Sequence, residues 1–283
     1  MSKQGIVHVD RPNPRTATVT FADPPTNVIV PETVARLHDV VVELSTDERV
    51  QVVVFASGTE GFFFNHFDLR QAARFPSTVG PDGSEVPTWV DLVLRLSKAP
   101  FVSIAKIRGR TRGGGNEFAL ACDLRYASRE QALFGQPEVG TGILPGGGGS
   151  ERLPRLIGRD RGLEAILTSQ DYDAGLAERY GWITRSLPDD ELDAFVDGIS
   201  TRIASFDKTV VAAAKAQINR ASLPPDADLS AAYAEYTRSL SAPAFQAGLA
   251  RLGQHFARRG LEVELRLGEY LGTVDAPPPL TTR

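Results

Sequence analysis

Two glutamates set among glycines are the residues of this sequence whose types and spacing predict acid–base chemistry. Glu117 follows three consecutive glycines, 113–115, in the first turn of a predicted helix. Glu138 follows Pro137, which stiffens the chain, and it precedes the glycine-rich segment 139–149. A carboxylate at a helix N-terminus beside a second one on a glycine-rich loop is the arrangement that proton transfer next to a carbonyl requires. Taken alone, Glu117 would only stabilise the helix dipole.

The glycine run 113–115 also predicts a site for negative charge. Glycine lets a ligand approach the backbone, and the first free N–H groups of a helix carry partial positive charge, so the run is suited to an oxyanion. A flexible turn is the alternative, and the three glycines taken alone favour it. A dinucleotide-binding fingerprint is excluded, because Phe118 stands where a small residue is needed. A Walker loop is excluded too, because neither this run nor 146–149 is followed by Lys and Ser or Thr.

Strands and helices alternate through the segments that must position these residues. This alternation is typical of an α/β protein with largely parallel strands. From about residue 158 onward the pattern becomes helical, with its longest stretch over 227–257. Segment 76–88 is predicted to be a mobile loop and 139–149 to be irregular. Strands are expected at 16–22, 51–56, 101–107 and 124–128. One helix is expected to begin at Pro31, and two others are expected at 89–96 and 114–122.

Composition and charge exclude several classes of protein. Of the 283 residues, 42% are hydrophobic and 23% charged, and the net charge is −4, which is the balance of a folded globular chain. Such a chain lacks the broad basic field that holds nucleic acid, and it has no window suited to a membrane span. Its one cysteine, Cys122, lies in an apolar run, so we expect a buried, inert thiol. Because the N-terminus shows no apolar leader, we expect a cytoplasmic protein.

Six segments carry recognisable motifs, namely 21–27 (FADPPTN), 61–69 (GFFFNHFDL), 98–100 (KAP), 113–123 (GGGNEFALACD), 134–138 (FGQPE) and 145–154 (PGGGGSERLP). Their order and spacing resemble those of the crotonase (enoyl-CoA hydratase/isomerase) superfamily over most of the chain. The resemblance implies an α/β fold built as a spiral of strand-strand-helix turns, with a helical C-terminal region used for oligomerisation. We therefore expect a spiral core over 1–205, a helical region over 206–272 and a loose tail over 273–283, assembled as a homotrimer or a dimer of trimers.

The resemblance also implies a substrate and a set of site residues. The substrate would be an acyl-CoA thioester, with no metal or other cofactor. Glu117 and Glu138 would flank its α,β double bond, and the backbone N–H groups of Asn65 and Gly114 would hold its thioester oxygen. Family isomerases and hydrolases commonly lack one glutamate, so the presence of both predicts an enoyl-CoA hydratase of fatty acid metabolism. The further residues expected to bind substrate are Asp68, Leu69, Gly113 and Trp89.

The sequence departs from the family pattern at Asn65 and His66, where Ala-Gly is usual. A side chain in place of glycine restricts the backbone and brings an imidazole near the thioester carbonyl. Three interpretations of His66 stay open. It packs against the phenylalanines 62–64, or it holds an acidic neighbour or a CoA phosphate, or it adds a third acid–base group.

Other charged and apolar residues near the motifs have two interpretations each. Asp23 stands where the family often has a basic residue, which leaves the contacts to the CoA phosphates unassigned. Arg108, Arg110 and Arg112 either steer an anionic CoA ester toward the site or end a solvated strand. The apolar residues within 89–94 either line an acyl pocket or belong to the core.

Other functions on the same fold stay open beside hydration. An enoyl-CoA isomerase would move the double bond, whereas a thioester or diketone hydrolase would recruit His66 as acid or base. A non-catalytic acyl-CoA-binding protein would bind the thioester and form no product. Fold similarity does not separate these possibilities, so the product has to be identified.

Overall fold

A six-stranded sheet in the order β1-β2-β3-β6-β8-β11 forms the centre of the fold in the computed structural model, which describes residues 6–80, 83 and 85–272. The pair β1 and β2 is antiparallel, and the other neighbours are parallel. Segments 52–55 and 102–105 are aligned in register and buried, as expected for a sheet covered on both faces. The strands of this sheet are β1 (Val7–Asn13), β2 (Thr16–Phe21), β3 (Val52–Ser57), β6 (Val102–Ile107), β8 (Leu124–Ser128) and β11 (Arg185–Leu187).

A smaller sheet in the order β10-β9-β7 brings the two glutamate-bearing segments together. Its strands β7 and β9 are parallel, and they pair Arg112 with Gly135. The chain after β7 enters the glycine run, and the chain after β9 leads to Glu138 three residues later. Because the two strands are parallel and in register, the segments that carry Glu117 and Glu138 both leave the small sheet at the same end. The strands of this sheet are β7 (Arg110–Arg112), β9 (Leu133–Gly135) and β10 (Asp171–Asp173).

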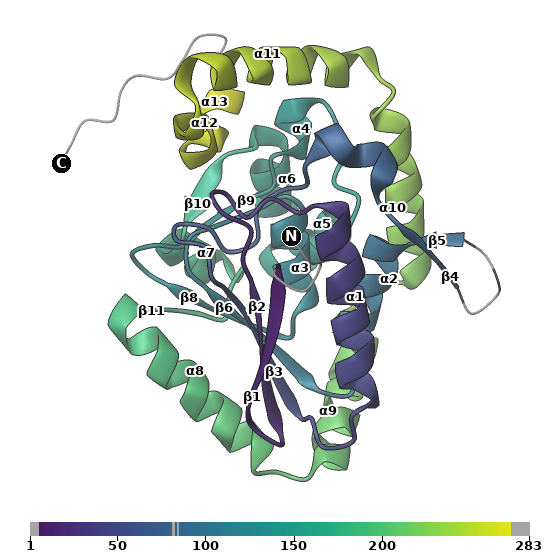
Figure 1. The fold of residues 1–283 in the computed structure, drawn as a ribbon, viewed down its shortest axis with the longest axis vertical. Helices are drawn as coiled ribbons and strands as arrows, with labels where there is room; N and C mark the ends of the chain where they lie inside the picture. Colours follow the sequence, from purple (N-terminus) through teal and green to yellow (C-terminus); the bar gives the residue numbers. More distant parts are fainter. Residues whose placement is uncertain (1–5, 81–82, 84, 273–283) are drawn as a thin grey trace.

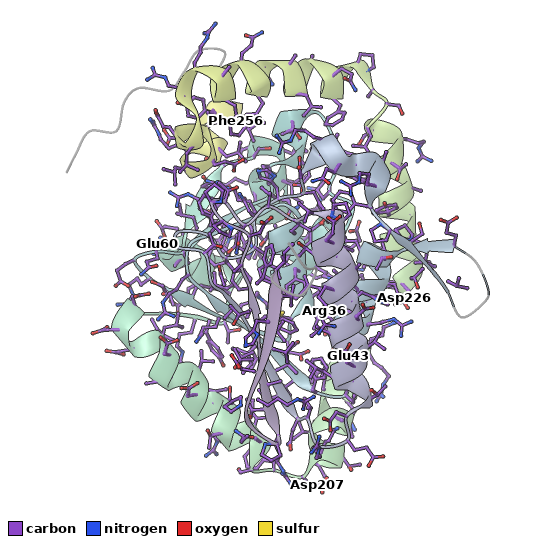
Figure 2. All side chains as sticks on the ribbon, viewed as in Figure 1. Arg36, Glu43, Glu60, Asp207, Asp226 and Phe256 are labelled. Carbon is purple, nitrogen blue, oxygen red and sulfur yellow. The ribbon has the colours of Figure 1, made fainter. Side chains whose placement is uncertain are left out.

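Helices cover both faces of the large sheet (Figure 1). The first helix, α1, begins at Pro31, whose fixed φ suits a first helical position, and it buries Val34 and Leu37. Its outer face carries the ion pair of Arg36 and Glu43, 3.0 Å apart (Figure 2). On the opposite face of the sheet, α8 packs with β3, β6 and β8 in a second apolar cluster. These helices are α1 (Pro31–Thr46), η1 (Leu69–Arg74), α2 (Thr88–Lys98), α3 (Gly114–Ala121), α4 (Glu138–Thr141), α5 (Gly149–Ile157), α6 (Arg159–Thr168), α7 (Ala174–Tyr180) and α8 (Asp189–Ala204).

The C-terminal helices run along one side of this body and then cross its end (Figure 1). The helix α11 lies so close to α4 that a Cβ on Gly248 would come 2.3 Å from the carbonyl oxygen of Thr141. The predicted continuous helical stretch over 227–257 is wrong, because the chain turns at 240–242 and Pro243 begins a new helix. The C-terminal helices are α9 (Lys208–Ser222), α10 (Asp226–Ser239), α11 (Pro243–Arg259), α12 (Leu261–Leu265) and α13 (Leu267–Leu271).

Three further segments differ from their prediction. The described part of 76–88 contains a two-stranded hairpin and is therefore not a plain loop. Residues 171–173 and 185–187 lie in the region predicted to be helical, but they form β10 and β11, because pairing with existing strands overrides weak local preference. Segment 139–149 is not wholly irregular, since α4 runs into it and α5 starts at its last residue. The hairpin strands are β4 (Ser77–Val79) and β5 (Glu85–Pro87).

Two expectations from composition can be compared with the structure. Cys122 is a buried free cysteine, as predicted, and burial raises the pKa of its thiol well above the usual range. Within the described residues, no helix combines the length and the apolar character needed to cross a membrane. The division of the chain at residue 206 stays a prediction, and the tail predicted over 273–283 lies outside the described residues.

Candidate active site

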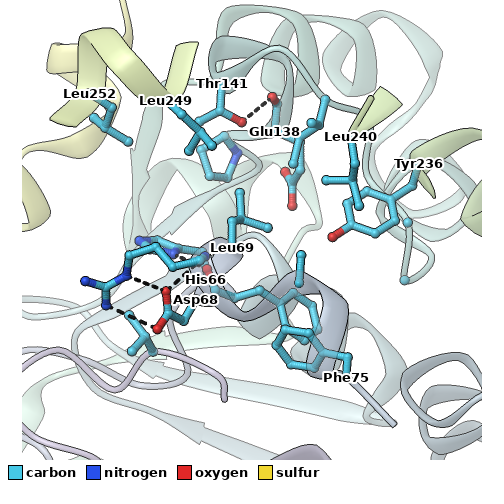
Figure 3. A pocket seen from close by; sticks show the side chains of 18 of the residues that line it. His66, Asp68, Leu69, Phe75, Glu138, Thr141, Tyr236, Leu240, Leu249 and Leu252 are labelled. Carbon is cyan, nitrogen blue, oxygen red and sulfur yellow. Dashed lines mark hydrogen bonds and ion pairs between the residues drawn. The ribbon is translucent and has the colours of Figure 1, made fainter. Parts of the chain in front are cut away.

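A cavity of about 960 Å³ lies between the sheet body and the C-terminal helices (Figure 3). The helices α2, α10 and α11 contribute apolar side chains to its walls. Among the residues predicted from the sequence, those that line the cavity are His66, Asp68, Leu69, Trp89, Glu117 and Glu138. Three others do not line it and lie in the wall behind, namely Asn65, Gly113 and Gly114.

Glu117 lies one turn into α3, and its carboxylate is held by the backbone. The strand β7 delivers the chain to Gly113, whose φ of 52° is a conformation that favours glycine, and α3 starts at the next residue. The Glu117 Oε1 accepts hydrogen bonds from the N–H groups of Gly147 at 2.7 Å and Gly149 at 3.1 Å. The glycine-rich segment after Glu138 thus serves to stabilise the other glutamate.

Glu138 begins the short helix α4, and its carboxylate has fewer donors. Its Oε2 accepts one hydrogen bond, from the Nε2 of Gln136 at 2.9 Å. The Gln136 side chain is itself oriented by Asn116, whose Nδ2 donates to the Gln136 Oε1 at 2.6 Å. The Tyr236 ring enters the cavity from α10, with its hydroxyl directed toward the Glu138 carboxylate (Figure 3).

The surroundings of the two glutamates favour opposite protonation states. Burial and the neighbouring Glu117 charge raise the pKa of Glu138 to about 8. Burial also raises the pKa of Glu117, but the N–H groups of Gly147 and Gly149 oppose that shift by stabilising the ionised form. Two carboxyls that interact across one cavity carry a single negative charge more readily than two negative charges. We therefore assign the charge to Glu117 and the proton to Glu138 at neutral pH.

The predicted oxyanion site needs one correction. The Asn65 N–H donates to the carbonyl of Asn27 at 3.0 Å, so this predicted donor is already used. Ile29 forms a parallel β-bridge with Phe67, in which the Ile29 N–H donates to the His66 carbonyl and the Asp68 N–H donates to the Ile29 carbonyl. The N–H of Phe67 itself therefore points away from Ile29. Among the described residues, no protein acceptor binds the N–H of Phe67 or of Gly114. These two free donors lie on segments in direct contact, since a Cβ on Gly114 would come 2.4 Å from the Phe67 ring.

His66 is an imidazolium paired with an acidic neighbour. Its Nδ1 lies 2.9 Å from the Phe67 carbonyl oxygen, which can only accept, and its Nε2 lies 3.1 Å from both carboxylate oxygens of Glu264. Both ring nitrogens therefore carry hydrogen. Burial alone would lower the pKa of His66, but the Glu264 charge and hydrogen bond outweigh it and raise the pKa. Burial opposes ionisation of Glu264 as well, yet the His66 charge lowers its pKa to about 2.

Glu264 is the site residue that sequence reasoning missed. It lies on α12, 198 residues from His66, and no motif surrounds it. Of the interpretations left open for His66, the acidic partner is the one the structure contains. His66 itself indicated such a residue, because an ionisable side chain in place of a glycine next to a buried site requires a partner elsewhere in the chain.

The three arginines before the glycine run are committed to internal contacts. Arg108 pairs with Asp189 at 2.7 Å and with Asp193 at 3.0 Å. Arg110 donates to the carbonyl of Leu265 at 2.9 Å, and Arg112 is fully buried against Asp171 at 2.6 Å. The prediction that they steer an anionic substrate is therefore not supported, because Arg108 and Arg112 are paired with carboxylates and Arg110 is bonded to backbone carbonyls.

The helix α2 contributes Trp89 to the cavity and its other apolar residues to the core. Val90 and Val93 are buried in the main apolar cluster and do not line the cavity. Leu94 packs against the same cluster from a partly buried position. The C-terminal region adds a further part of the apolar wall, with Leu240, Leu249 and Leu252 facing the same space (Figure 3).

Comparison with known proteins identifies the class to which this fold and site belong. Residues 13–251 match the family model described as enoyl-CoA hydratase/isomerase, and the chain belongs to this family of enzymes. Its fold is the crotonase fold that the sequence motifs predicted.

Individual relatives carry more specific names. A short-chain-enoyl-CoA hydratase of Clostridium acetobutylicum is 33% identical over 207 residues, which is 73% of this chain and 78% of the relative. A crotonyl-CoA hydratase of Syntrophomonas wolfei is 32% identical over 201 residues, or 68% of this chain and 73% of the relative. The crystal structure of a candidate enoyl-CoA hydratase from Streptomyces avermitilis is 43% identical, with a TM-score of 0.86 and coverage of 98% of this chain and 99% of that one.

Proposed function

We propose that this enzyme adds water across the double bond of a trans-2-enoyl-CoA thioester, with Glu117 and Glu138 as its two proton carriers. One observation carries the proposal. Both carboxyls face one cavity, where two backbone N–H groups stabilise charge on Glu117 while burial and the Glu117 charge raise the pKa of Glu138 to about 8. Hydration needs this combination, because a base must activate water while an acid delivers a proton.

The proposed steps balance without any further reactant. The Glu117 carboxylate removes a proton from water while the hydroxyl oxygen bonds to C3, and the π electrons move onto the thioester oxygen. Glu138 then delivers its proton to C2, which re-forms the carbonyl. A proton returned from Glu117 to Glu138 restores the starting state. The addition is neutral in redox terms and its charge is stabilised by backbone dipoles, so we propose that the enzyme uses no metal or other cofactor.

The developing enolate oxygen would be held by the N–H groups of Gly114 and Phe67. Phe67 replaces the Asn65 donor predicted from the sequence, whose N–H is bonded to Asn27. Preorganised donors of this kind each contribute about 3 kcal/mol to transition-state stability. Asp68, Leu69 and Trp89, which line the cavity, are proposed to contact the thioester and its acyl chain, and Gly113 stays a proposed substrate contact.

The alternative activities make different demands on the site. An isomerase would use the same two glutamates to move a proton from C4 to C2, so only its product distinguishes it. A hydrolase that uses His66 as a base is not supported, because both nitrogens of that ring are engaged. A non-catalytic acyl-CoA-binding protein would have no need for two buried carboxyls of opposite protonation.

We also propose an assembly and a compartment. No residue of helix α9 is fully buried, and the helix exposes Val210 at 67% and Ile218 at 66%. Such apolar exposure suits contact with other copies, so we propose a homotrimer or a dimer of trimers formed through the C-terminal region.

A buried free thiol suits a reducing compartment, so we propose that the enzyme is cytoplasmic. We also propose that it takes part in fatty acid metabolism. Light scattering and cell fractionation test these proposals.

The decisive experiment identifies the product. Purified enzyme is mixed with crotonyl-CoA and with longer trans-2-enoyl-CoAs, while loss of the enoyl-thioester absorbance is followed and the product mass is determined. We expect a gain of one water, absent in the Glu138→Gln variant. An unchanged mass with a moved double bond would show an isomerase, and free CoA a hydrolase. Binding without any product would contradict an enzymatic function.

A further inference from the structure

The strongest unexplained feature of the molecule is a cluster of polar side chains behind the cavity, joined by Glu264. We propose that Glu264 is a positioning residue that holds both arms of the oxyanion hole in place. The first arm is the segment that ends in the Phe67 N–H, and the second is the segment that ends in the Gly114 N–H. This inference rests on the proposed function, in which these two groups bind the enolate oxygen.

The carboxylate of Glu264 fixes the first arm through two consecutive side chains. Its Oε2 accepts from the Nδ2 of Asn65 at 3.1 Å, and the His66 Nε2 lies 3.1 Å from both of its oxygens. Asn65 and His66 directly precede Phe67 in the chain. The other ring nitrogen of His66 donates to the Phe67 carbonyl at 2.9 Å, so the contact continues to the donor residue itself.

The backbone of Glu264 fixes the second arm. Its carbonyl oxygen accepts from the Arg112 Nη1 at 2.5 Å. Arg112 stands two residues before Gly114 and is fully buried, and Asp171 holds its guanidinium through two hydrogen bonds of 2.8 and 2.6 Å. One residue of α12 therefore contacts both arms, through its side chain on one and its carbonyl on the other.

The departures at Asn65 and His66 explain why such a clamp is needed. The Ala-Gly pair usual in the family has no polar side-chain atoms, whereas Asn65 and His66 place an amide and an imidazole in the wall. Asn65 is fully buried, and its Oδ1 has no hydrogen-bond partner among the described residues, so Glu264 is what satisfies its Nδ2. These three residues form one unit, because the Glu264 carboxylate is the hydrogen-bond partner of both the Asn65 Nδ2 and the His66 Nε2.

Several charges surround this unit. His66 and Arg112 both lower the pKa of Glu264, and Arg70 of η1 also interacts with it electrostatically. On the other side of Arg112 lies Asp171, which compensates its charge. Through Arg112 and Asp171 the unit is anchored on β7 and β10 as well as on α12, which makes the short C-terminal helix part of the catalytic architecture.

The proposal is tested in the full-length enzyme with Glu264→Gln. Glutamine keeps the size of the side chain and one acceptor oxygen, but it loses the negative charge that pairs with His66, and its NH2 group cannot accept a hydrogen bond. We expect kcat to fall about tenfold or more while KM changes little, because the oxyanion contacts strengthen in the transition state. The matched control is Glu262→Gln on the same helix, whose carboxylate contacts only Arg266 and Tyr270 within the described residues and should leave both constants unchanged.

A second measurement separates this proposal from the proposed function. Acetoacetyl-CoA is a β-ketoacyl thioester whose enolate has its own ultraviolet absorbance, and its binding requires an oxyanion site but no turnover. We expect the wild-type enzyme to bind the enolate form and Glu264→Gln to lose that absorbance. If the wild type binds the enolate but hydrates no enoyl-CoA, the proposed function fails and the clamp can still be assessed. Equal enolate binding by wild type and Glu264→Gln would overturn the clamp.

A double-mutant comparison covers the possibility that Glu264→Gln folds poorly. The variant Asn65→Ala/His66→Gly restores the pair usual in the family and removes the groups through which Glu264 acts. In that background Glu264→Gln should have little further effect on kcat or enolate binding, so the effects should be strongly non-additive. An effect of the same size in both backgrounds would show that Glu264 acts through general stability and would refute a positioning role.

Discussion

The imidazolium of His66 lies 3.1 Å from the carboxylate of Glu264, and this contact joins the wall of the active site to the C-terminal helix α12. Removal of one member of a buried ion pair leaves the other charge without its partner. The pair therefore contributes to the stability of the protein as well as to its site, and its effect depends on pH in a predictable way.

The first prediction concerns His66→Ala. The pKa of Glu264 is lowered from 4.5 to about 2, so its contribution is full above pH 4.5 and is lost as the pH falls. The pKa of His66 is raised above 6.5, so its contribution is full below that value and is lost as the pH rises through its folded-state pKa. Between these limits, His66→Ala should lower the free energy of unfolding by about 3 kcal/mol.

Urea unfolding across the pH range measures this effect. The difference between wild type and His66→Ala should be largest between pH 4.5 and 6.5 and should shrink on both sides. The control is His8→Ala, which removes an exposed histidine whose side chain is 69% accessible and should change little. A difference independent of pH would contradict the ion pair.

The second prediction concerns the pH dependence of the reaction. Glu138 must be protonated to act as the acid, and burial together with the Glu117 charge raises its pKa to about 8. The value of kcat/KM should therefore fall as the pH rises above about 8. It should also fall at low pH, where Glu117 takes up a proton at a pKa raised by burial. A profile of kcat/KM that stays flat from pH 7 to well above 8 would rule out Glu138 as the acid.

The third prediction is that Glu138→Gln lowers the activity of the enzyme and raises its stability. Loss of the acid should lower kcat by about a hundredfold or more. The raised pKa means that the folded protein disfavours the ionised form, so stability declines from the usual carboxyl pKa of 4.5 up to about 8. Glutamine has no charge and retains an acceptor for Gln136, so the free energy of unfolding at pH 8 should rise by about 1 to 3 kcal/mol.

Thermal and urea unfolding of Glu138→Gln, beside single-turnover kinetics, measure both effects. Glu130→Gln replaces a glutamate on the protein surface and serves as the control that should alter neither. A variant that loses stability together with activity would show that Glu138 supports the fold and does not act in proton transfer.

The fourth prediction concerns Gly114→Ala. The added Cβ would come 2.4 Å from the Phe67 ring, so one segment of the oxyanion site must move. Overpacking of this kind costs about 1 to 3 kcal/mol in stability. Displacing a donor should lower kcat by about a hundredfold, and acetoacetyl-CoA enolate binding should weaken in parallel. Gly198→Ala is the control, since a Cβ added there would meet no described atom within 4 Å, and it should retain full activity.

Much of the fold followed from local sequence. The strands at 52–55 and 102–105 are short runs rich in apolar residues, and the helix begun by Pro31 has apolar residues at helical spacing. These local patterns predict their conformation without reference to the rest of the chain. The predictions were wrong where local preference was weak. Residues 171–173 are a strand only because β9 lies beside them, and the stretch over 227–257 turns before Pro243.

The same division holds for the site. The sequence by itself determined the family, the two glutamates and the glycine run, because this chemistry requires particular residue types at fixed short spacings. Only the tertiary structure decided that the Asn65 N–H is used by Asn27, leaving Phe67 as the donor, and that Glu264 pairs with His66. A hydrogen bond or ion pair between distant segments depends on where the folded backbone places them, and no local pattern in the sequence records that placement.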